Sequence, residues 1–596
     1  MKLTRRLPRL TAATAALALT LAACGGGKPP ATSASTTGGA RSGGVATFAL
    51  PPGAEPNYIL PFFSGAHASV VNNRQFKYLF FVPMYWFGKN GQPVFNERLS
   101  LAYPPRYSRG GRVVTVRLKG WKWSDGETVD AKDVMFWMHL LQTEKKNWYG
   151  YVPGGFPDNV SSVRATSALT VQFTLERPYN QTWFTYNELS QILPLPSRWD
   201  RTRSGPSDCA AKVADCPAVY RYLTAQAASP ATYARNPLWQ VVDGPWRLAA
   251  YNTTGYVKMV PNPRYSGPDK PHLSAFVEQP FTSDSSEVNA LLAGRISYGY
   301  LPYTDLHLAA RLRGQGYRLH PWVGWSINYF PENFNNPKLG PVFRQLYFRQ
   351  AFQHLVDQPL DVKVAYHGYG YPTYGPVPLK PANPWVTGAE SHNPYPFSVA
   401  AAKALLSAHG WKVVPGGVDT CTGSCGPGIA RGTRLVISLQ YESGSPSVST
   451  VMQELKTNAS RAGIQLELST APFNQIIANA APCTPSQAAC RWQMENWGGG
   501  WVYEPDFYPT GGELFATGAG SNFGSFSDPS VDRAIARTHE PGATLASYQR
   551  LLMRDLPVVW QANADYQISV VKADLGGTTP QDPLLYIYPQ SWYLKK

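Results

Sequence analysis

The 596-residue sequence is poor in charge and lacks the short motifs of common enzymes. Only 15% of its residues are Asp, Glu, Lys or Arg. Its histidines are all at least 13 residues apart, which excludes the paired imidazoles of an HExxH zinc site. There is no Walker loop, no GxGxxG between a strand and a helix, and no GxSxG nucleophile elbow. We therefore predict that the protein is not an enzyme, and we expect neither a metal nor a cofactor.

The positive charge is too diffuse for nucleic-acid binding. Lys and Arg outnumber Asp and Glu by 54 to 38, a formal net charge of +16, without a run of five basic residues. Four of these charges lie within the first ten residues. Aromatic residues, in contrast, make up 13% of the chain and hydrophobic residues 43%, which indicates packed cores in a chain long enough for several domains.

The N-terminus has the features of an export signal. A basic start is followed by apolar residues up to Ala23, a stretch too short to span a bilayer. The end of this stretch, Leu-Ala-Ala-Cys, resembles a bacterial lipobox, in which the cysteine receives a diacylglycerol and becomes the new N-terminus. We predict a signal peptide over 1–23, a lipid anchor at Cys24 and a flexible tether over 24–42, rich in Gly, Ser and Thr. The alternative is an ordinary signal peptide with a chance cysteine. No later segment is long and apolar enough to cross a membrane.

The six other cysteines form three local couples in turn-rich surroundings. An even number of cysteines in close pairs, in an exported chain, predicts three small disulfides that close surface loops. A zinc site is disfavoured because no CxxC pair occurs and the couples are far apart. The predicted disulfides are Cys209–Cys216, Cys421–Cys425 and Cys483–Cys490.

Hydrophobic patterning predicts a mixed α/β protein. We expect strands over 43–50 and 113–118, and a helix that starts after the capping residue Asp130, with Asp133 at its third position. In the second half, a strand over 435–439, a helix over 447–462 and a strand over 464–468 predict a βαβ unit with parallel strands. Further helices are expected over 341–356 and 399–409.

Three segments interleave aromatic residues with glycine: 323–334, 365–375 and 497–508. Aromatic faces offer a large contact area at low entropic cost, and glycines let a ligand approach the backbone. A Gly triplet between Trp497 and Trp501 also fits poorly into a regular element. We interpret these segments, 497–508 above all, as candidate ligand surfaces, while core or loop packing is the more common role of any single aromatic residue in them.

Six segments, in order along the chain, resemble the solute-binding proteins of family 5, the peptide- and nickel-type receptors of ATP-driven (ABC) importers. They are 119–134 (KGWKWSDG followed by DAKDV), 243–248 with 262–265, 291–296, 348–357, 402–411 and 525–532. The resemblance implies a type II periplasmic-binding-protein fold, a venus flytrap of two α/β lobes with an extra subdomain inserted in lobe I. By analogy, lobe I comprises 43–75, 200–320 and 561–596, the inserted subdomain 76–199, and lobe II 321–560. Ligand would bind between the lobes, and the protein would be a monomer that delivers it to the permease subunits.

One departure from the family affects the ligand. Oligopeptide receptors commonly have an Asp three residues before the Asp-Pro of lobe II, where it can pair with the peptide's α-amine. When Glu504-Pro505 is aligned with that Asp-Pro, an aromatic residue or Val stands where the acid belongs. Glu504 or Asp506 could replace that acid. The surplus aromatics also suit an oligosaccharide, whereas nickel would favour clustered imidazoles, which are absent. The candidate ligand-binding residues are Glu55, Trp325, Asn328, Tyr329, Trp497, Gly499, Trp501, Tyr503, Glu504 and Asp506.

Three functions remain open at this point. The leading hypothesis is a lipid-anchored receptor for di- or oligopeptides that feeds an importer. An oligosaccharide receptor of the same fold is the alternative within the family. A surface protein that kept the fold but signals without importing belongs to a different class.

Overall fold

The computed structural model describes residues 40–596, so the predicted signal peptide, the lipid anchor at Cys24 and most of the predicted tether lie outside the described residues. Within 40–596, no helix is long and apolar enough to cross a membrane. The described chain begins with β1 (Ala40–Arg41), at the end of the predicted tether. This strand pairs with β29 (Tyr593–Lys595), near the C-terminus.

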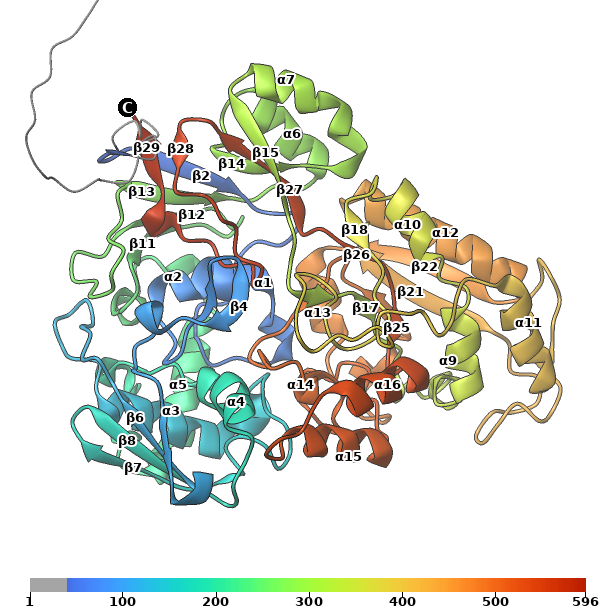
Figure 1. The fold of residues 1–596 in the computed structure, drawn as a ribbon, viewed down its shortest axis with the longest axis horizontal. Coiled ribbons are helices and arrows are strands. Elements are labelled where there is room, and N and C mark those ends of the chain that lie inside the picture. Colours follow the sequence, from blue (N-terminus) through green and yellow to red (C-terminus); the bar gives the residue numbers. More distant parts are fainter. Residues whose placement is uncertain (1–39) are drawn as a thin grey trace, which may run out of the picture. The chain divides into compact units, whose positions relative to one another are not determined.

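A seven-stranded mixed sheet forms the core of the first lobe (Figure 1). Its central strand, β2 (Val45–Ala49), runs parallel to both neighbours, while the outer pairs are antiparallel. The N-terminal, middle and C-terminal parts of the chain therefore share one sheet, while the predicted bounds of lobe I stay a prediction. In spatial order the strands are β11 (Trp246–Tyr251), β12 (Val257–Pro261), β13 (Ala275–Gln279), β2, β14 (Tyr298–Leu301), β27 (Gln567–Lys572) and β15 (Tyr317–Trp322).

A second, four-stranded antiparallel sheet lies within the range predicted for the inserted subdomain. The order is β5 (Arg106–Ser108), β6 (Val113–Arg117), β8 (Thr170–Leu175) and β7 (Val160–Ser167). Helix α3 (Ala131–Glu144) packs on it and starts as predicted, because the Asp130 and Asp133 carboxylates cap each other's backbone N–H groups. Asp133 also accepts a hydrogen bond from the Trp123 indole at 2.8 Å. The family-like segment 119–134 thus has a structural role at the start of α3. That residues 76–199 form a separate inserted subdomain stays a prediction.

The second lobe contains the predicted βαβ unit. Strands β21 (Val436–Glu442) and β22 (Gln465–Ala471) are parallel, and α12 (Pro446–Arg461) connects them. The helix ends where Gly463 takes a φ of +84°, a conformation that favours glycine. Strand β23 (Met494–Asn496) lies on the other side of β21 and completes a three-stranded parallel sheet.

Two of the predicted helices differ in outcome. The helix over 399–409 is confirmed as α11 (Val399–Ala408). The single helix predicted over 341–356 is wrong: it is two helices, α8 (Gly340–Phe343) and α9 (Leu346–Gln353). The backbone of Gln345 is extended there, with a ψ of 118°, which breaks the helical hydrogen-bond ladder.

The remaining elements are short. The other helices are α1 (Val70–Asn72), α2 (Tyr78–Phe80), α4 (Gln181–Trp183), α5 (Cys216–Ala227), α6 (Asp284–Leu292), α7 (Ala309–Gly314), α10 (Gln358–Val364), α13 (Phe473–Asn479), α14 (Gly512–Phe515), α15 (Pro529–Thr538) and α16 (Ala546–Asp555). Paired short strands are β3 (Phe87–Lys89) with β4 (Gln92–Phe95), β9 (Arg201–Thr202) with β10 (Gly205–Pro206), β16 (Ser326–Ile327) with β24 (Trp501–Val502), β17 (Tyr329–Phe330) with β25 (Val559–Trp560), β18 (Gly370–Tyr371) with β26 (Asn563–Ala564), β19 (Trp411–Lys412) with β20 (Thr420–Cys421), and β28 (Leu575–Gly576) with β29.

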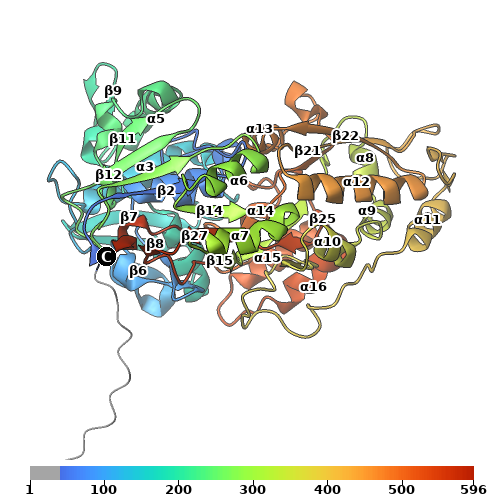
Figure 2. The ribbon, with the colours of Figure 1, turned by 90° about the horizontal axis from the view of Figure 1, so that it is seen from above.

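The chain crosses between the lobes twice, at neighbouring positions (Figures 1 and 2). It leaves the first lobe after β15 and returns just before β27, and these two strands pair in the seven-stranded sheet. At the crossing itself, the backbone N–H of Tyr566 donates to the carbonyl of Trp322 at 2.7 Å. Two adjacent crossing segments are what a hinge between two lobes requires.

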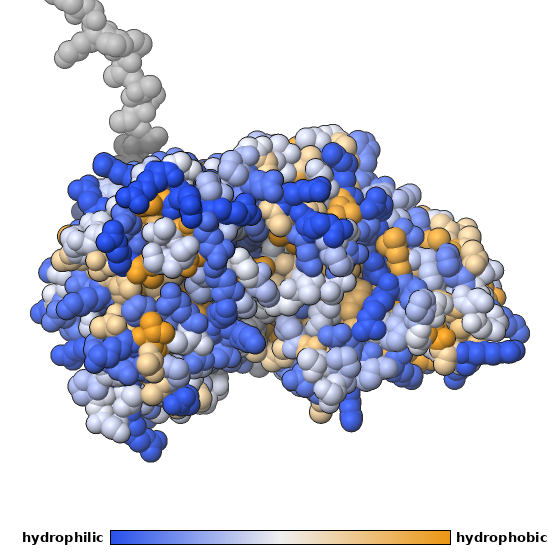
Figure 3. Space-filling view, turned by 90° about the horizontal axis from the view of Figure 1, so that it is seen from below, coloured by the Kyte–Doolittle hydropathy of each residue, from blue (hydrophilic) through white to orange (hydrophobic). Residues whose placement is uncertain are grey.

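Much of the aromatic content belongs to the core. Eight tryptophans are among the largest fully buried side chains, from both lobes: Trp123, Trp137, Trp148, Trp199, Trp239, Trp246, Trp325 and Trp560. The face of the molecule in Figure 3 is largely hydrophilic, with small separate apolar patches. Many of the aromatic residues therefore stabilise the core, and only some of them are available to bind a ligand.

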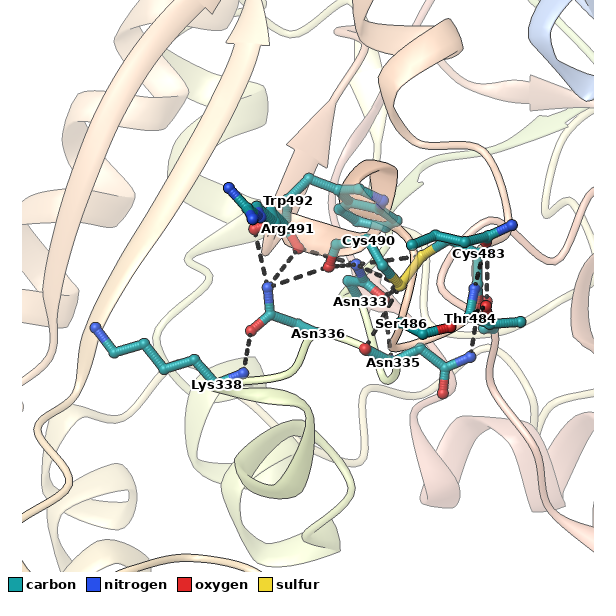
Figure 4. The surroundings of a disulfide bond; sticks show 12 residues. Asn333, Asn335, Asn336, Lys338, Cys483, Thr484, Ser486, Cys490, Arg491 and Trp492 are labelled. Atoms are coloured by element: carbon teal, nitrogen blue, oxygen red, sulfur yellow. Dashed lines mark hydrogen bonds between the residues drawn. A yellow bond between two sulfur atoms is a disulfide. The ribbon is translucent and has the colours of Figure 1, made fainter.

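The three predicted disulfides are present. The Cys483–Cys490 loop is fixed to the segment 333–338 by asparagine side chains (Figure 4). The Asn333 amide donates to the carbonyls of Cys490 at 3.1 Å and Trp492 at 2.9 Å, and the Asn335 amide to that of Cys483 at 2.8 Å. This disulfide thus orders a loop that docks on the second lobe.

Replacing both Cys483 and Cys490 by serine is expected to lower the free energy of unfolding by about 2 kcal/mol, because closure of a short loop no longer restricts the unfolded chain. Urea unfolding followed by tryptophan fluorescence measures this loss. The matched control is the double serine variant of Cys421 and Cys425, which closes a shorter loop. An unchanged urea midpoint for the first variant would contradict the assigned role.

Candidate functional site

A cavity lies between the two lobes and is lined by both of them. The centres of water molecules could occupy about 230 Å³ of it. The first lobe contributes the loop before α1, a one-turn π-helix at Asn73–Lys77, the start of α6 and the end of β14. The second lobe contributes the end of β21, the start of α12, part of α13 and the segment 497–504. A cavity between two lobes is a common position of a ligand site.

The three aromatic–glycine segments come together at the second-lobe side of this cavity. Segment 323–334 and segment 497–508 pair through β16 and β24, with Ser326 opposite Val502 and Ile327 opposite Trp501. Segment 365–375 pairs with the returning chain through β18 and β26. Tyr366, from this third segment, also lines the cavity. The sequence pattern singled out these segments separately; the structure joins two of them by strand pairing and brings a residue of the third to the same cavity.

Five of the predicted residues line the cavity: Asn328, Trp497, Gly499, Trp501 and Glu504. Their neighbours hold the larger side chains in place. The Trp497 ring lies edge-on to Tyr329 at a centroid distance of 5.2 Å, and the Trp501 indole donates to Glu513 at 3.4 Å. The Asn328 amide donates to the carbonyl of Ala562 at 2.6 Å, which ties the cavity wall to the returning crossing segment.

The glycine triplet has two distinct roles in this wall. Gly498 has a φ of +80°, and a β-carbon there would lie 2.6 Å from an oxygen of Glu442. A β-carbon on Gly500 would approach Ser326 and Asn563 as closely as 2.5 Å. A β-carbon on Gly499, in contrast, would meet no atom within 4 Å, so the backbone of this residue borders open space. Two glycines permit close packing, and the third leaves room for a ligand.

The other five predicted residues lie outside the lining of this cavity. Trp325 and Tyr329 are buried in the second lobe, where Trp325 packs against Trp385 at 5.7 Å. Tyr503 is fully buried and donates to the carbonyl of Pro376. Glu55 is half-buried; its backbone carbonyl accepts a hydrogen bond from Asn474 at 3.0 Å. Asp506 lines a second cavity, described below.

The Glu504 carboxylate already binds two side chains from the first part of the chain. It forms an ion pair of 2.7 Å with the guanidinium of Arg74, a side chain that is 1% exposed, and also accepts a hydrogen bond from Tyr78. The same guanidinium donates to the carbonyls of Tyr503, at 2.7 Å, and Leu584. Arg74 therefore joins the segment 503–504 to the C-terminal part of the chain. Because this carboxylate is already neutralised, it is a poor partner for a ligand amine.

Asp506 belongs to a separate cluster of buried carboxyl groups. Its oxygens accept hydrogen bonds from Asn187, from the Thr510 hydroxyl at 2.8 Å and from the Gly512 N–H at 3.1 Å. Burial raises its pKa to about 7. Glu188 and Glu513 line the same second cavity, and burial, with a smaller effect of the Asp506 charge, raises the pKa of Glu188 to about 8.

The raised pKa of Glu188 predicts a pH dependence of stability. The folded state holds this proton more tightly than the unfolded chain, so the contribution of Glu188 is complete below its ordinary pKa of 4.5 and is lost as the pH rises towards 8. Between pH 5 and pH 7 this costs the wild-type protein about 2 kcal/mol of unfolding free energy. Replacing Glu188 by glutamine is expected to abolish this pH-dependent loss, because glutamine does not titrate. Urea unfolding across this range measures it, with Glu176→Gln, at an exposed position, as the control. A wild-type pH profile retained by Glu188→Gln would contradict the assignment.

Sequence reasoning missed three carboxylates that line the main cavity: Asp284, Glu442 and Asp565. Glu442 is the last residue of β21, at the carboxyl end of a parallel strand, which is where ligands bind in open α/β sheets. That position could have identified it. Asp284, in the first turn of α6, is indistinguishable in sequence from an ordinary residue that stabilises a helix start.

The comparisons with known proteins agree with this geometry. Residues 98–518 match the family model of bacterial extracellular solute-binding proteins, family 5 (middle region). The chain belongs to this family. Its members are solute-binding proteins rather than enzymes, and the two-lobed type II fold expected for it is found in solved family structures. The family resemblance predicted from the six sequence segments is confirmed.

Individual relatives are distant but cover most of the chain. Protein XP55 of Streptomyces lividans is 25% identical over 492 residues, 79% of this chain and 78% of its own length. A putative ABC transporter peptide-binding protein of Brucella ovis is 23% identical over 61% of this chain and 59% of its own. The oligopeptide-binding protein AppA of Bacillus subtilis, solved with a nonapeptide, has a TM-score of 0.75 at 17% identity, over 94% of this chain and 100% of its own.

Proposed function

We propose that this protein is a lipid-anchored extracytoplasmic receptor that binds a di- or oligopeptide in the cavity between its lobes and delivers it to an ABC permease. The observation that carries the proposal is the cavity itself, which both lobes line beside two adjacent crossing segments. A ligand held by both lobes favours the arrangement in which they are in contact, and that arrangement is what a permease can recognise. Membership of the family and the peptide-binding relatives support this function.

The proposal is tested by filling the cavity. Gly499 tolerates a side chain, because its backbone is not in the left-handed region and no atom lies within 4 Å of a β-carbon. Gly499→Leu is expected to fold normally but to lose the rise in melting temperature that a peptide pool gives the wild-type protein. The matched control is Gly314→Leu, at the exposed end of α7, where a β-carbon also meets nothing. Peptide stabilisation that survives Gly499→Leu would place the ligand elsewhere.

An oligosaccharide is the alternative ligand, because Trp497 and Trp501 both line the cavity and sugar rings stack on such faces. An oligosaccharide pool in the same thermal-shift experiment separates the two classes. If neither pool stabilises the protein, a surface protein that signals without importing becomes the better account.

A further inference from the structure

The main cavity carries an excess of negative charge. Four carboxylates line it, those of Asp284, Glu442, Glu504 and Asp565, but Arg74 is the only basic side chain among the described lining residues. Arg74 is fully engaged by Glu504 and by backbone carbonyls. Lys380, outside the lining, acts on the charge of Asp565. Asp284 and Glu442 are therefore the lining carboxylates that no basic side chain of the described residues balances.

These two carboxylates come from opposite sides of the cavity. Asp284 lies at the start of α6 in the first lobe, where it accepts a hydrogen bond from the Tyr300 hydroxyl at 3.1 Å. Glu442 lies at the end of β21 in the second lobe, against Gly498, and has no hydrogen-bond partner within residues 40–596. Both carboxylates line the one cavity, and burial, with a smaller effect of the charge of Asp284, raises the pKa of Glu442 to about 8.

Independent polar groups also lack partners in this cavity. The Asn73 side chain is 4% exposed, lines the cavity, and its amide oxygen has no hydrogen bond within the described residues. The Asp565 side chain is 7% exposed, lines the cavity and likewise has no hydrogen-bond partner in that part of the chain. A buried acceptor without a donor, such as the amide oxygen of Asn73, is costly, and a donor on the ligand would satisfy it.

We propose that this cavity recognises a cationic group of the ligand, an ammonium or a guanidinium, which is held between Asp284 and Glu442. Asp565 and Asn73 accept further hydrogen bonds from the same ligand. A cation in this position favours the ionised form of both acids and is attracted to both lobes, so its charge contributes directly to the closed arrangement. The inference rests on the proposed function, since it specifies the chemistry of the ligand in the same cavity. It moves the amine-binding role from Glu504 and Asp506 to a different pair of acids.

The binding should also release protons. Burial raises the pKa of Asp284 to about 6, beside the value of about 8 for Glu442, and a bound cation favours the ionised form of both. The affinity is therefore expected to rise from pH 5 to pH 8. Calorimetry in phosphate and in Tris at pH 7 detects the released protons as a buffer-dependent heat. The titratable and charged groups that face the cavity or act on its acids are Asp284, Glu442, Glu504, Asp565, Asp305, Arg74, Lys380, Tyr149, Tyr300, Tyr303, Tyr366 and Tyr566.

The direct test uses matched ligands on the mature protein. Calorimetry compares Ala-Lys-Ala-Ala, the neutral Ala-Gln-Ala-Ala, the N-acetylated form of each, and spermidine as a free amine. The expected result is that the ligand lacking both cationic groups, acetylated Ala-Gln-Ala-Ala, binds about 10- to 100-fold more weakly than Ala-Lys-Ala-Ala. Equal binding of all four peptides would overturn the inference and leave the peptide receptor intact. Binding of spermidine without any peptide would uphold the inference and overturn the peptide receptor, and binding of none would overturn both.

Variants of Glu442 and Asp284 then test whether these two acids cause the preference for a cationic ligand. Glu442→Gln and Asp284→Asn keep the size of each side chain, and Asp284→Asn keeps an acceptor for Tyr300. Each is expected to reduce binding of Ala-Lys-Ala-Ala by about tenfold or more and to leave the acetylated Gln peptide unaffected. Glu467→Gln, at an exposed position on the neighbouring strand β22, is the matched control. Equal weakening of charged and uncharged peptides would mark the two acids as structural only and would overturn the assignment.

Discussion

Replacing Arg74 by methionine is expected to lower the free energy of unfolding by about 3–5 kcal/mol, because it leaves a buried carboxylate without its counter-charge. Arg74 is 1% exposed, and its guanidinium serves Glu504 and the carbonyls of Tyr503 and Leu584 at once. Methionine matches the apolar stem of arginine but cannot donate a hydrogen bond. The loss therefore includes unpaired carbonyls as well as the unpaired charge.

Urea unfolding measures this effect. Two further variants test whether it comes from the loss of a buried ion pair. Arg98→Met removes an arginine from a surface pair with Asp269, in which Arg98 is 58% exposed, and is expected to cost less than about 1 kcal/mol. Adding Glu504→Gln to Arg74→Met is expected to restore part of the stability, since no uncompensated charge then remains. An Arg74→Met protein as stable as Arg98→Met would contradict the role given to this ion pair.

Replacing Trp501 by alanine is expected to weaken both ligand binding and folding. The ring lines the main cavity but is only 8% exposed, and it packs edge-on to Phe523 at 5.6 Å. Removing it leaves an internal void and frees the Glu513 carboxyl, which together are expected to cost about 3 kcal/mol of stability. Loss of an aromatic contact is expected to reduce peptide affinity by about tenfold or more.

The matched variant Trp501→Phe separates the two effects. Phenylalanine keeps most of the packing and loses the hydrogen bond to Glu513, so we expect it to retain most of the stability and part of the affinity. Thermal unfolding and calorimetry on the same samples give both numbers. Normal stability with strongly reduced affinity in Trp501→Ala would mean that the ring is exposed to ligand and has no core role.

The local architecture was predictable because its causes are local. The capping pair Asp130 and Asp133 fixes the start of α3, and Gly463 ends α12, so both helices follow from neighbouring residues. The parallel pairing of β21 and β22 follows from the length of the connecting helix. The break at Gln345 was missed, because the apolar pattern of α9 continues through it into α8.

The site was only partly predictable because its partners are distant in sequence. Glu504, predicted from the sequence to bind ligand, lines the cavity, but its neutralising partner Arg74 lies 430 residues away. No pattern around Arg74 marks it as the partner of an acid in the second lobe. The presence of Asp284 and Glu442 in one cavity likewise depends on how the two lobes meet, which no local spacing records.

The central claim is that the cavity between the lobes holds a peptide. Native mass spectrometry of the protein, purified gently from its own host, tests this most directly, because a ligand enclosed by two lobes dissociates slowly. The account predicts a mass excess that is released on denaturation, fragments as a peptide and is absent from Gly499→Leu. A released molecule that is not a peptide, or a peptide that remains bound to Gly499→Leu, would contradict it.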